Sequence, residues 1–245
     1  MTDGPRTLAV DLGGTGMKML VLDAEGKPID ERTREPTPKP ASPESVLGSL
    51  LTRAAAHEPF DRIAFGFPGV VRHGIVHTAP NLGTALWRGV PLELELQTRT
   101  GRPARVVNDA DLQGYGVVDG QGVEMVLTLG TGLGAALFVD GHLVPNLELG
   151  HHPFTKGKTY EQRVCDAELR RIGKQRWTTR VQAMFEVLEP VFNYDRLHLG
   201  GGNVRHLRGA LPAKVRVFAN AEGLRGGLWV WRRAQEGARS AATPS

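Results

Sequence analysis

Two short turns rich in glycine and threonine are the first places at which this sequence could do chemistry. One is Asp11-Leu12-Gly13-Gly14-Thr15, with Lys18 just after it, and the other is Gly130-Thr131-Gly132-Leu133-Gly134. Glycine lets the backbone approach a bulky anion and present its N–H groups, and threonine adds a hydroxyl donor. Two such turns favour a clamp for a chain of phosphates, with the Asp11 carboxylate holding Mg²⁺ through water. The alternative for each turn alone is an ordinary tight hairpin.

A second kind of chemistry is indicated by Asn108-Asp109, which follows a strand predicted at residues 105–107. Strand ends in α/β proteins are where catalytic groups tend to lie. A carboxylate there could accept the proton of an attacking hydroxyl, and the neighbouring amide could fix a sugar hydroxyl. Because Asn-Asp is also a common turn dipeptide, a plain turn is the alternative.

Glu148-Leu149-Gly150-His151 places a carboxylate and an imidazole three residues apart. A carboxylate accepts two hydrogen bonds and histidine donates or accepts, so this pair could bind vicinal hydroxyls. A surface turn is the alternative. Zinc is disfavoured, because His151 and His152 have no further ligand nearby except Cys165.

Basic residues dominate residues 156–180. Eight bases stand against three acids, Glu161, Asp166 and Glu168; the bases are Lys156, Lys158, Arg163, Arg170, Arg171, Lys174, Arg176 and Arg180. This stretch is either a solvated helical face or an electropositive rim for a long polyanion.

Two similar sets of predicted elements position these groups. Apolar strands at 8–10 and 17–22 flank the first turn, and strands at 125–129 and 135–139 flank the second, with helices after each pair. The pattern predicts an α/β fold with two related lobes around a cleft.

The predicted boundaries follow from these elements. We expect an N-terminal lobe at residues 1–109, a C-terminal lobe at 110–234 and a disordered tail at 235–245. Within the first lobe, Ser42 is predicted to cap a helix whose first position is Pro43.

Composition narrows the class of protein. The 245 residues are 40% hydrophobic and include one cysteine, so a globular core is expected and a disulfide framework is excluded. A single cysteine favours a reducing, cytoplasmic setting. The sequence contains no run of 18 apolar residues, so it predicts no membrane span. The net charge of +4 suits an anionic ligand without identifying one.

These motifs together resemble the ROK family of sugar kinases and repressors, within the actin-like ATPase superfamily with its ribonuclease H-like fold. The order of the motifs carries the resemblance. It runs through both glycine turns, Phe67-Pro68-Gly69, Pro80-Asn81-Leu82 with Trp87, Asn108-Asp109-Ala110, Glu148-Leu149-Gly150-His151, Leu199-Gly200-Gly201-Gly202 and Ala221-Glu222-Gly223-Leu224-Arg225-Gly226.

The chain departs from the family pattern at two places. Most members carry a cysteine-rich zinc motif after the histidine. Here Lys158-Thr159-Tyr160-Glu161-Gln162-Arg163-Val164 stands instead, which is similar to the zinc-free polyphosphate glucokinases. ROK repressors begin with a helix-turn-helix domain, and none is expected before the first strand of this chain.

The resemblance implies roles for individual residues. Asp109 is the expected base for the 6-hydroxyl of glucose. The expected sugar ligands are Asn81, Asn108, Glu148, His151 and Glu161. The two turns, with Asp11 and Lys18, are expected to hold the donor phosphates together with Mg²⁺, and Gly200, Gly201 and Gly202 to face a nucleotide.

The implied activity is transfer of a phosphoryl group from polyphosphate, ATP or both to glucose, by a homodimer that binds no zinc and no nucleic acid. An ATP-dependent kinase of another hexose or N-acetylhexosamine, or a sugar-sensing protein without turnover, remains the alternative.

Overall fold

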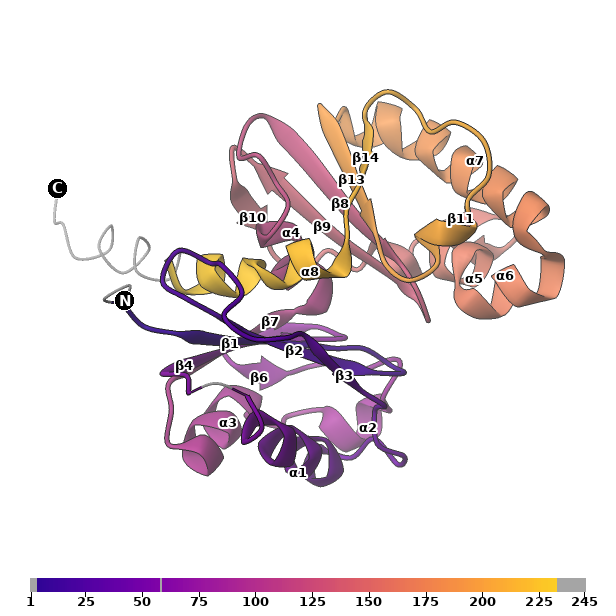
Figure 1. Cartoon of the computed structure of the whole chain (residues 1–245). Coiled ribbons are helices and arrows are strands. Elements are labelled where there is room, and N and C mark those ends of the chain that lie inside the picture. Colours follow the sequence, from indigo (N-terminus) through magenta and orange to yellow (C-terminus); the bar gives the residue numbers. More distant parts are fainter. Residues whose placement is uncertain (1–3, 58, 233–245) are drawn as a thin grey trace, which may run out of the picture. The chain divides into compact units, whose positions relative to one another are not determined.

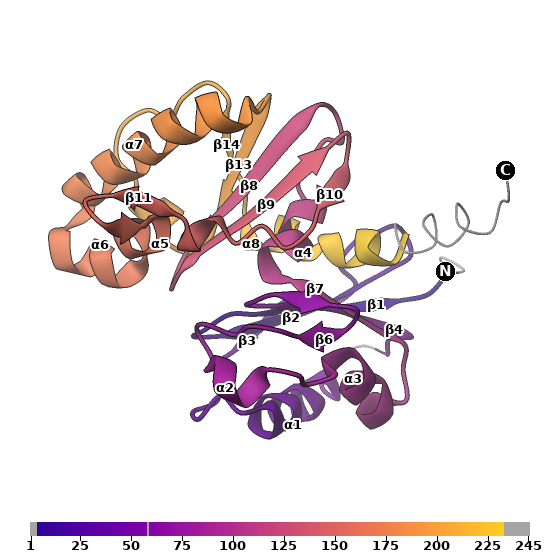
Figure 2. The same cartoon turned by 180° about the vertical axis from the view of Figure 1, so that it is seen from behind.

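The structure is a computed structural model that describes residues 4–57 and 59–232, and the chain within it forms two compact units. Unit 1 runs through Gly116 and resumes at Ala221, and unit 2 comprises Val117–Asn220. Each unit contains one five-stranded sheet (Figures 1 and 2). Among the described residues, no helix is long and apolar enough to cross a membrane.

The sheet of unit 1 has the strand order β3-β2-β1-β4-β7. Its strands are β1 (Thr7–Leu12), β2 (Met17–Leu22), β3 (Thr33–Glu35), β4 (Arg62–Phe67) and β7 (Ala104–Asn108). The first three are antiparallel, whereas β4 and β7 run parallel to β1. The short strands β5 (Val71–Arg72) and β6 (Ile75–Val76) pair separately.

Both faces of this sheet are covered, which explains why β1 is apolar almost throughout. Leu8 and Val10 face a core beneath α1 (Pro43–Ala54), α2 (Thr84–Trp87) and α3 (Leu92–Thr100). On the other face (Figure 1), Ala9 packs with Leu224 of α8 (Asn220–Leu224), and Ala64 packs with Leu112 of α4 (Asp109–Tyr115).

Helix α1 begins as the sequence predicts. Ser42 has extended backbone geometry, its Oγ accepts the N–H of Ser45 at 3.2 Å, and Pro43 occupies the first helical position. The cap pairs one N–H that would otherwise have no helical partner, so the predicted start of this helix is confirmed.

The sheet of unit 2 has the order β10-β9-β8-β13-β14. Its strands are β8 (Val123–Leu129), β9 (Leu133–Val139), β10 (His142–Val144), β13 (Arg196–Gly200) and β14 (Val215–Val217). Its other elements are η1 (Leu149–His151), β11 (Pro153–Thr155), β12 (Lys158–Thr159), α5 (Tyr160–Val164), α6 (Asp166–Ile172), α7 (Lys174–Phe192) and η2 (Val204–His206). Val181, Met184 and Phe185 of α7 join the core beneath this sheet.

The two sheets share one topology. In each, three antiparallel strands are followed by two parallel ones, and the hairpin between the first two strands carries a glycine turn. Two related α/β units are therefore present, as the repeated strand–turn–strand pattern predicts.

The boundaries differ from those expected. Helix α4 and the chain from Ala221 onward belong to unit 1 rather than to the C-terminal lobe. The physical reason is long-range packing, because Val230 and Leu112 share a cluster with Ala64 of β4. The tail predicted at 235–245 lies outside the described residues.

Candidate active site

The first glycine turn joins β1 to β2 in unit 1. Gly13 donates its N–H to the carbonyl of Gly16 at 2.8 Å, and Thr37 Oγ1 donates to the carbonyl of Gly13 at 2.7 Å. The carbonyls therefore point toward protein partners. No hydrogen bond within the described chain uses the N–H of Gly14, so that donor is available for an anion.

Asp11 and Lys18 lie opposite each other on β1 and β2. Lys18 Nζ is 2.7 Å from Asp11 Oδ2, and Asp11 is buried. The role predicted for both side chains at the phosphate site stays a prediction, and in the structure they form an ion pair with each other. This pairing fixes the base of the turn and partly neutralises the lysine.

Arg34 is a basic residue near this turn that the sequence analysis missed. It lies on β3 opposite Lys18, and a Cβ added at Gly16 would lie 3.1 Å from its guanidinium nitrogens. A planar guanidinium at this place is suited to a phosphate. Arg34 comes 18 residues after Gly16 in the sequence, so only the pairing of β2 with β3 reveals the proximity.

Asn108 and Asp109 lie where β7 ends and α4 begins. The Oδ1 of Asn108 caps α4 by accepting the N–H groups of Ala110 and Asp111, and its Nδ2 donates to the carbonyl of Gly69 at 3.2 Å. One Nδ2 hydrogen remains for a sugar hydroxyl. Asp109 is half-buried and starts the helix.

Helix α4 connects Asp109 to the first turn. One turn beyond Asp109, Gln113 Nε2 donates to Asp11 Oδ2 at 3.4 Å. The helix also approaches β4 closely, because a Cβ at Gly66 would lie 3.2 Å from Asp109 Cα and 2.8 Å from Leu112 Cδ2. Helix α4 therefore carries the expected base, Asp109, and also contacts the expected phosphate turn through Gln113.

The predicted sugar-side loop lies in the same unit. Trp87 is buried, its Nε1 donates to the carbonyl of Ala41 at 2.8 Å, and its ring lies 4.8 Å from that of Phe67. Asn81 is exposed in the turn between Ala79 and α2. The aromatic pair is structural support, and Asn81 is the polar side chain that the loop presents.

The second glycine turn joins β8 to β9 in unit 2. Its backbone is held from three sides. The carbonyl of Gly130 accepts the N–H of Asp166 at 2.9 Å and Nδ2 of Asn203 at 3.2 Å, and Leu133 donates its N–H to Glu161 Oε2 at 3.0 Å. Thr131 is exposed at the tip. The turn is rigid, as an anion site requires.

The expected nucleotide-side glycines have structural reasons of their own. A Cβ at Gly200 would lie 2.1 Å from Phe218 Cζ, and one at Gly201, whose φ is 91°, would lie 2.3 Å from the carbonyl oxygen of Leu129. Nothing approaches within 4 Å of a Cβ at Gly202. Close packing therefore accounts for glycine at positions 200 and 201, whereas no packing contact requires glycine at position 202.

The expected sugar ligands Glu148, His151 and Glu161 gather in unit 2. His151 Nε2 is 3.4 Å from Glu148 Oε2. Burial raises the pKa of Glu148 above its ordinary value of 4.5; His151 opposes this shift and the nearby Glu161 carboxylate adds to it. Since Glu161 also holds Leu133 of the second turn, sugar ligands and phosphate turn are mechanically linked.

Comparison with known proteins identifies the family to which this chain belongs. The sequence model of the ROK family matches residues 7–165, more than half of the chain. This chain belongs to the ROK family. Its two five-stranded sheets are the two lobes of the actin-like ATPase fold of ROK proteins.

Two kinases are similar to about four fifths of the chain. The polyphosphate glucokinase of Mycobacterium tuberculosis (strain CDC 1551 / Oshkosh) is 30% identical over 203 residues, which are 79% of this chain and 76% of that protein. The Mycobacterium leprae (strain TN) enzyme of the same name is 31% identical over 216 residues, 82% of this chain and 64% of that protein.

A solved structure of a polyphosphate-dependent kinase is also similar to this chain. The inorganic polyphosphate/ATP-glucomannokinase of Arthrobacter sp. strain KM superposes with a TM-score of 0.83 at 30% identity, over 94% of this chain and 100% of that one.

Where the ROK resemblance leads one to expect a zinc motif, this chain forms the hairpin β11–β12 and helix α5. The ring of Phe154 stacks on that of buried Tyr160 at 4.4 Å, and Thr159 and Gln162 form a reciprocal cap at the start of α5. Packing and capping thus order this segment and place Glu161.

The basic stretch at 156–180 is partly neutralised. Arg170 Nε is 2.8 Å from Asp166, whereas Arg171 and Arg180 both bind Glu168. The hydrogen bond from Arg171, reinforced by Arg180, outweighs burial and holds the pKa of Glu168 at about 2. Each of these three arginines thus has a carboxylate partner on α6, which offsets part of the positive charge of the stretch.

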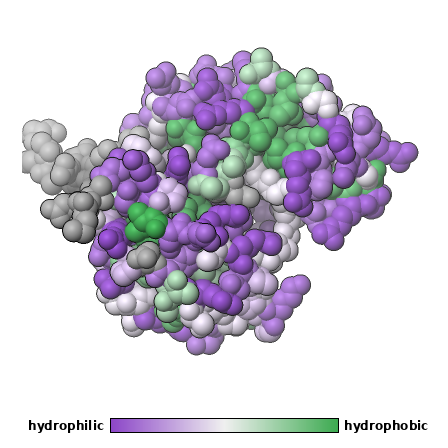
Figure 3. Space-filling view, viewed as in Figure 1, coloured by the Kyte–Doolittle hydropathy of each residue, from purple (hydrophilic) through white to green (hydrophobic). Residues whose placement is uncertain are grey.

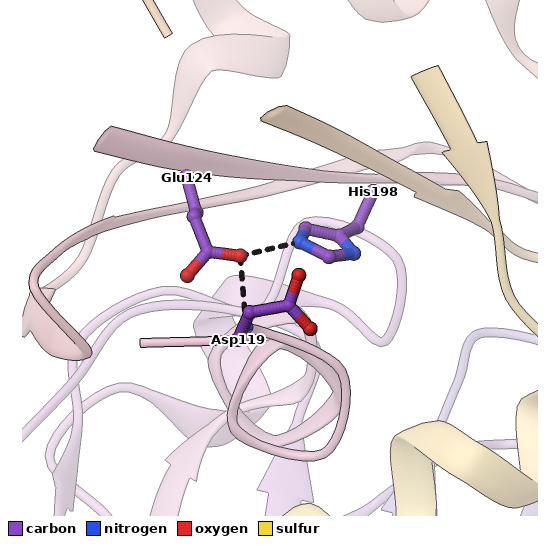
Figure 4. Close-up of side chains that lie close together, drawn as sticks. All are labelled: Asp119, Glu124 and His198. Atoms are coloured by element: carbon purple, nitrogen blue, oxygen red, sulfur yellow. Dashed lines mark hydrogen bonds and ion pairs between the residues drawn. The ribbon is translucent and has the colours of Figure 1, made fainter. Parts of the chain in front are cut away.

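One group of three potential metal ligands occurs within residues 4–57 and 59–232, namely Asp119, Glu124 and His198 (Figure 4). Glu124 accepts the N–H of Asp119 at 2.9 Å and that of Gly120 at 2.6 Å, and His198 Nε2 is 2.6 Å from it. The carboxylate of Asp119 binds Arg196 and Arg216.

These contacts use the potential metal ligands internally. Burial of Glu124 opposes its ionisation, but hydrogen bonds from Asp119, His198, Gly120 and Gln121 outweigh burial and lower the pKa of Glu124. The group secures the chain just after it enters unit 2 and is a structural ion network.

Proposed function

We propose that this chain is a sugar kinase that transfers a phosphoryl group from polyphosphate, ATP or both to the 6-hydroxyl of glucose. One observation carries the proposal: Asp109 starts the same helix whose Gln113 contacts Asp11 of the first glycine turn. A base and a phosphate site on one support are what phosphoryl transfer to a hydroxyl requires. The 30% identity to polyphosphate glucokinases and to the Arthrobacter glucomannokinase supports the same reaction.

In this mechanism Asp109 accepts the proton of the 6-hydroxyl as its oxygen attacks the terminal phosphorus of the donor. The bond between that phosphorus and the donor's bridging oxygen breaks, and the shortened donor leaves with the electron pair. Positioning and neutralisation of charge lower the barrier. The backbone N–H groups of the two turns supply part of that neutralisation.

The sugar ring is held by hydrogen bonds to Glu148, His151 and Glu161, with Asn81 and the remaining Nδ2 hydrogen of Asn108 as further ligands. Carboxylates suit this role because each accepts hydrogen bonds from two vicinal hydroxyls. The link from Glu161 to Leu133 lets a bound sugar stiffen the second turn.

Mg²⁺ fits the first turn through Asp11, whose Oδ1 is not used by Lys18 or Gln113. A single buried carboxylate would hold the ion mainly through water, with donor phosphate oxygens as its other ligands. The ion would neutralise charge on the donor. We include in the proposal that the protein works as a homodimer, which light scattering of the purified chain would test.

The deciding experiment measures glucose 6-phosphate formation with polyphosphate or ATP in the presence of Mg²⁺. Asp109→Asn keeps the side chain's shape but removes its proton affinity, and it should lower kcat about 10²- to 10⁴-fold with glucose binding retained. Glu31→Gln, at an exposed carboxylate of unit 1, is the control and should leave kcat unchanged. Near-normal turnover by the Asp109 variant would refute the assigned base.

Mannose is a second substrate to test, because the similar Arthrobacter structure is named a glucomannokinase. Turnover of mannose with kcat/KM within about tenfold of glucose would extend the proposal to both hexoses. Turnover of neither sugar with either donor would favour a sugar-sensing role.

A further inference from the structure

Four basic residues of unit 2 lie close together and are here called the basic cluster: Lys174, Arg205, His206 and Arg208. Lys174 begins α7, and Arg205 and His206 lie in η2. The segment is held against α7, because Arg208 donates its N–H to Thr178 Oγ1 at 3.2 Å. Arg205 Nε also lies 3.3 Å from His206 Nε2.

The charges of the cluster act on its histidine. Partial burial, and then the charges of Lys174, Arg205 and Arg208, lower the pKa of His206, and only Asp166 opposes them. The three cations are therefore close enough to repel a fourth positive charge. They lie on two stretches of sequence, the start of α7 and residues 205–208, that folding brings together.

The cluster lacks the counter-charges that its neighbours have. Lys174, Arg205 and Arg208 are exposed, and no ion pair in the described part of the chain links any of them to a carboxylate. By contrast, Arg170, Arg171 and Arg180 are paired with Asp166 or Glu168. Figure 3 shows a largely hydrophilic surface where α6 meets the start of α7. Unpaired, mutually repelling cations favour binding of a polyanion.

The cluster is attached to the second phosphate turn. Asn203, two residues before Arg205, donates its N–H to the carbonyl of Leu129 at 3.0 Å and its Nδ2 to that of Gly130 at 3.2 Å, and it accepts the N–H of His206 at 2.9 Å. The carbonyl of Gly130 also accepts the N–H of Asp166, where α6 begins. Turn and cluster thus share one framework inside unit 2.

We propose that the basic cluster binds the distal phosphates of a linear inorganic polyphosphate whose terminal phosphates occupy the second glycine turn. This inference rests on the proposed kinase function. A polyphosphate carries charge at nearly every phosphate, so it can contact cations beyond the turn. ATP has only three phosphates followed by an uncharged nucleoside, and it gains little from distant cations.

The test combines Lys174→Gln, Arg205→Gln and Arg208→Gln in one variant. The control combines Arg32→Gln, Lys39→Gln and Arg102→Gln, which removes the same charge from exposed residues of unit 1. We expect the cluster variant to raise the KM for long-chain polyphosphate about 10- to 30-fold, because three phosphate contacts are lost. Its KM for tripolyphosphate and ATP, and its kcat, should stay within about twofold of the parent.

Direct binding separates this inference from the kinase proposal. Calorimetry with long-chain polyphosphate, without glucose, should show binding to the parent and the control and a loss in the cluster variant. If polyphosphate binds through the cluster but is not turned over, polyphosphate is refuted as the phosphoryl donor, whereas the proposed binding site is supported. Equal losses in both triple variants, no binding by the parent, or equally tight binding of a single-stranded oligonucleotide of matched charge would overturn the inference.

Discussion

Replacing Gly66 by alanine should displace Asp109, the expected catalytic base, while leaving its carboxylate chemically unchanged. Gly66 lies in β4 beneath the start of α4. An added Cβ would lie 2.8 Å from Leu112 Cδ2 and 3.2 Å from Asp109 Cα, where ordinary contacts begin at 3.4 Å. Leu112 is fully buried, so the helix itself must move by a few tenths of an ångström. Such overpacking costs about 1–3 kcal/mol of stability.

The displacement sets the expected loss of activity. A 1 Å misplacement costs about 10²-fold in rate, so a shift of about 0.3–0.5 Å should lower kcat about 4- to 10-fold. The KM for glucose should change less, because Glu148, His151 and Glu161 belong to unit 2. A coupled assay of glucose 6-phosphate gives kcat and KM, and urea unfolding gives the change in stability.

Gly48→Ala is the matched control. Gly48 lies in α1, is exposed, and has no atom within 4 Å of an added Cβ. Alanine there should increase stability by about 0.5–1 kcal/mol and leave kcat unchanged. An unaltered kcat in a destabilised Gly66→Ala protein would refute the argument that packing of α4 on β4 places Asp109.

Three further predictions concern charged side chains. Because the pKa of Glu148 is raised above 4.5, the KM for glucose should rise as the pH falls toward that pKa, and Glu148→Gln should raise the KM about 10- to 100-fold and flatten the profile. Arg34→Gln should raise the KM of both donors about 3- to 10-fold, whereas Arg32→Gln should not; equal effects would remove Arg34 from the site. The pKa of Glu168, about 2 against an ordinary 4.5, contributes stability that is full above pH 4.5 and lost as the pH falls toward 2. Urea unfolding across that range should show a shallower pH dependence for Glu168→Gln than for the parent.

Local patterns were enough to predict much of this molecule. The two glycine turns, their flanking strands and the cap at Ser42 depend on neighbouring residues, whose preferences act over a few positions. The order of the motifs was enough to indicate the family. The segment around Tyr160 that stands in place of the family's cysteine-rich motif was also visible in the sequence, because one contiguous motif replaces another.

Only the tertiary structure decided which charged and polar groups have partners. Lys18 is paired with Asp11, and Asn108 uses most of its hydrogen-bonding capacity as a helix cap. Arg171 is bound by Glu168, so the basic stretch is less open than its composition suggests. A charge count records how many cations a segment has, whereas their availability depends on acceptors that folding brings near.

Tertiary structure also decided which distant segments share one support. The return of the chain at Ala221 to unit 1, and the meeting of Lys174 with residues 205–208, have no local signal. Both arise because apolar faces of helices must cover sheets, and the elements that cover one sheet need not be adjacent in sequence. The sequence alone therefore determined the chemistry available to this protein, and burial of its two cores determined which of those groups lie together.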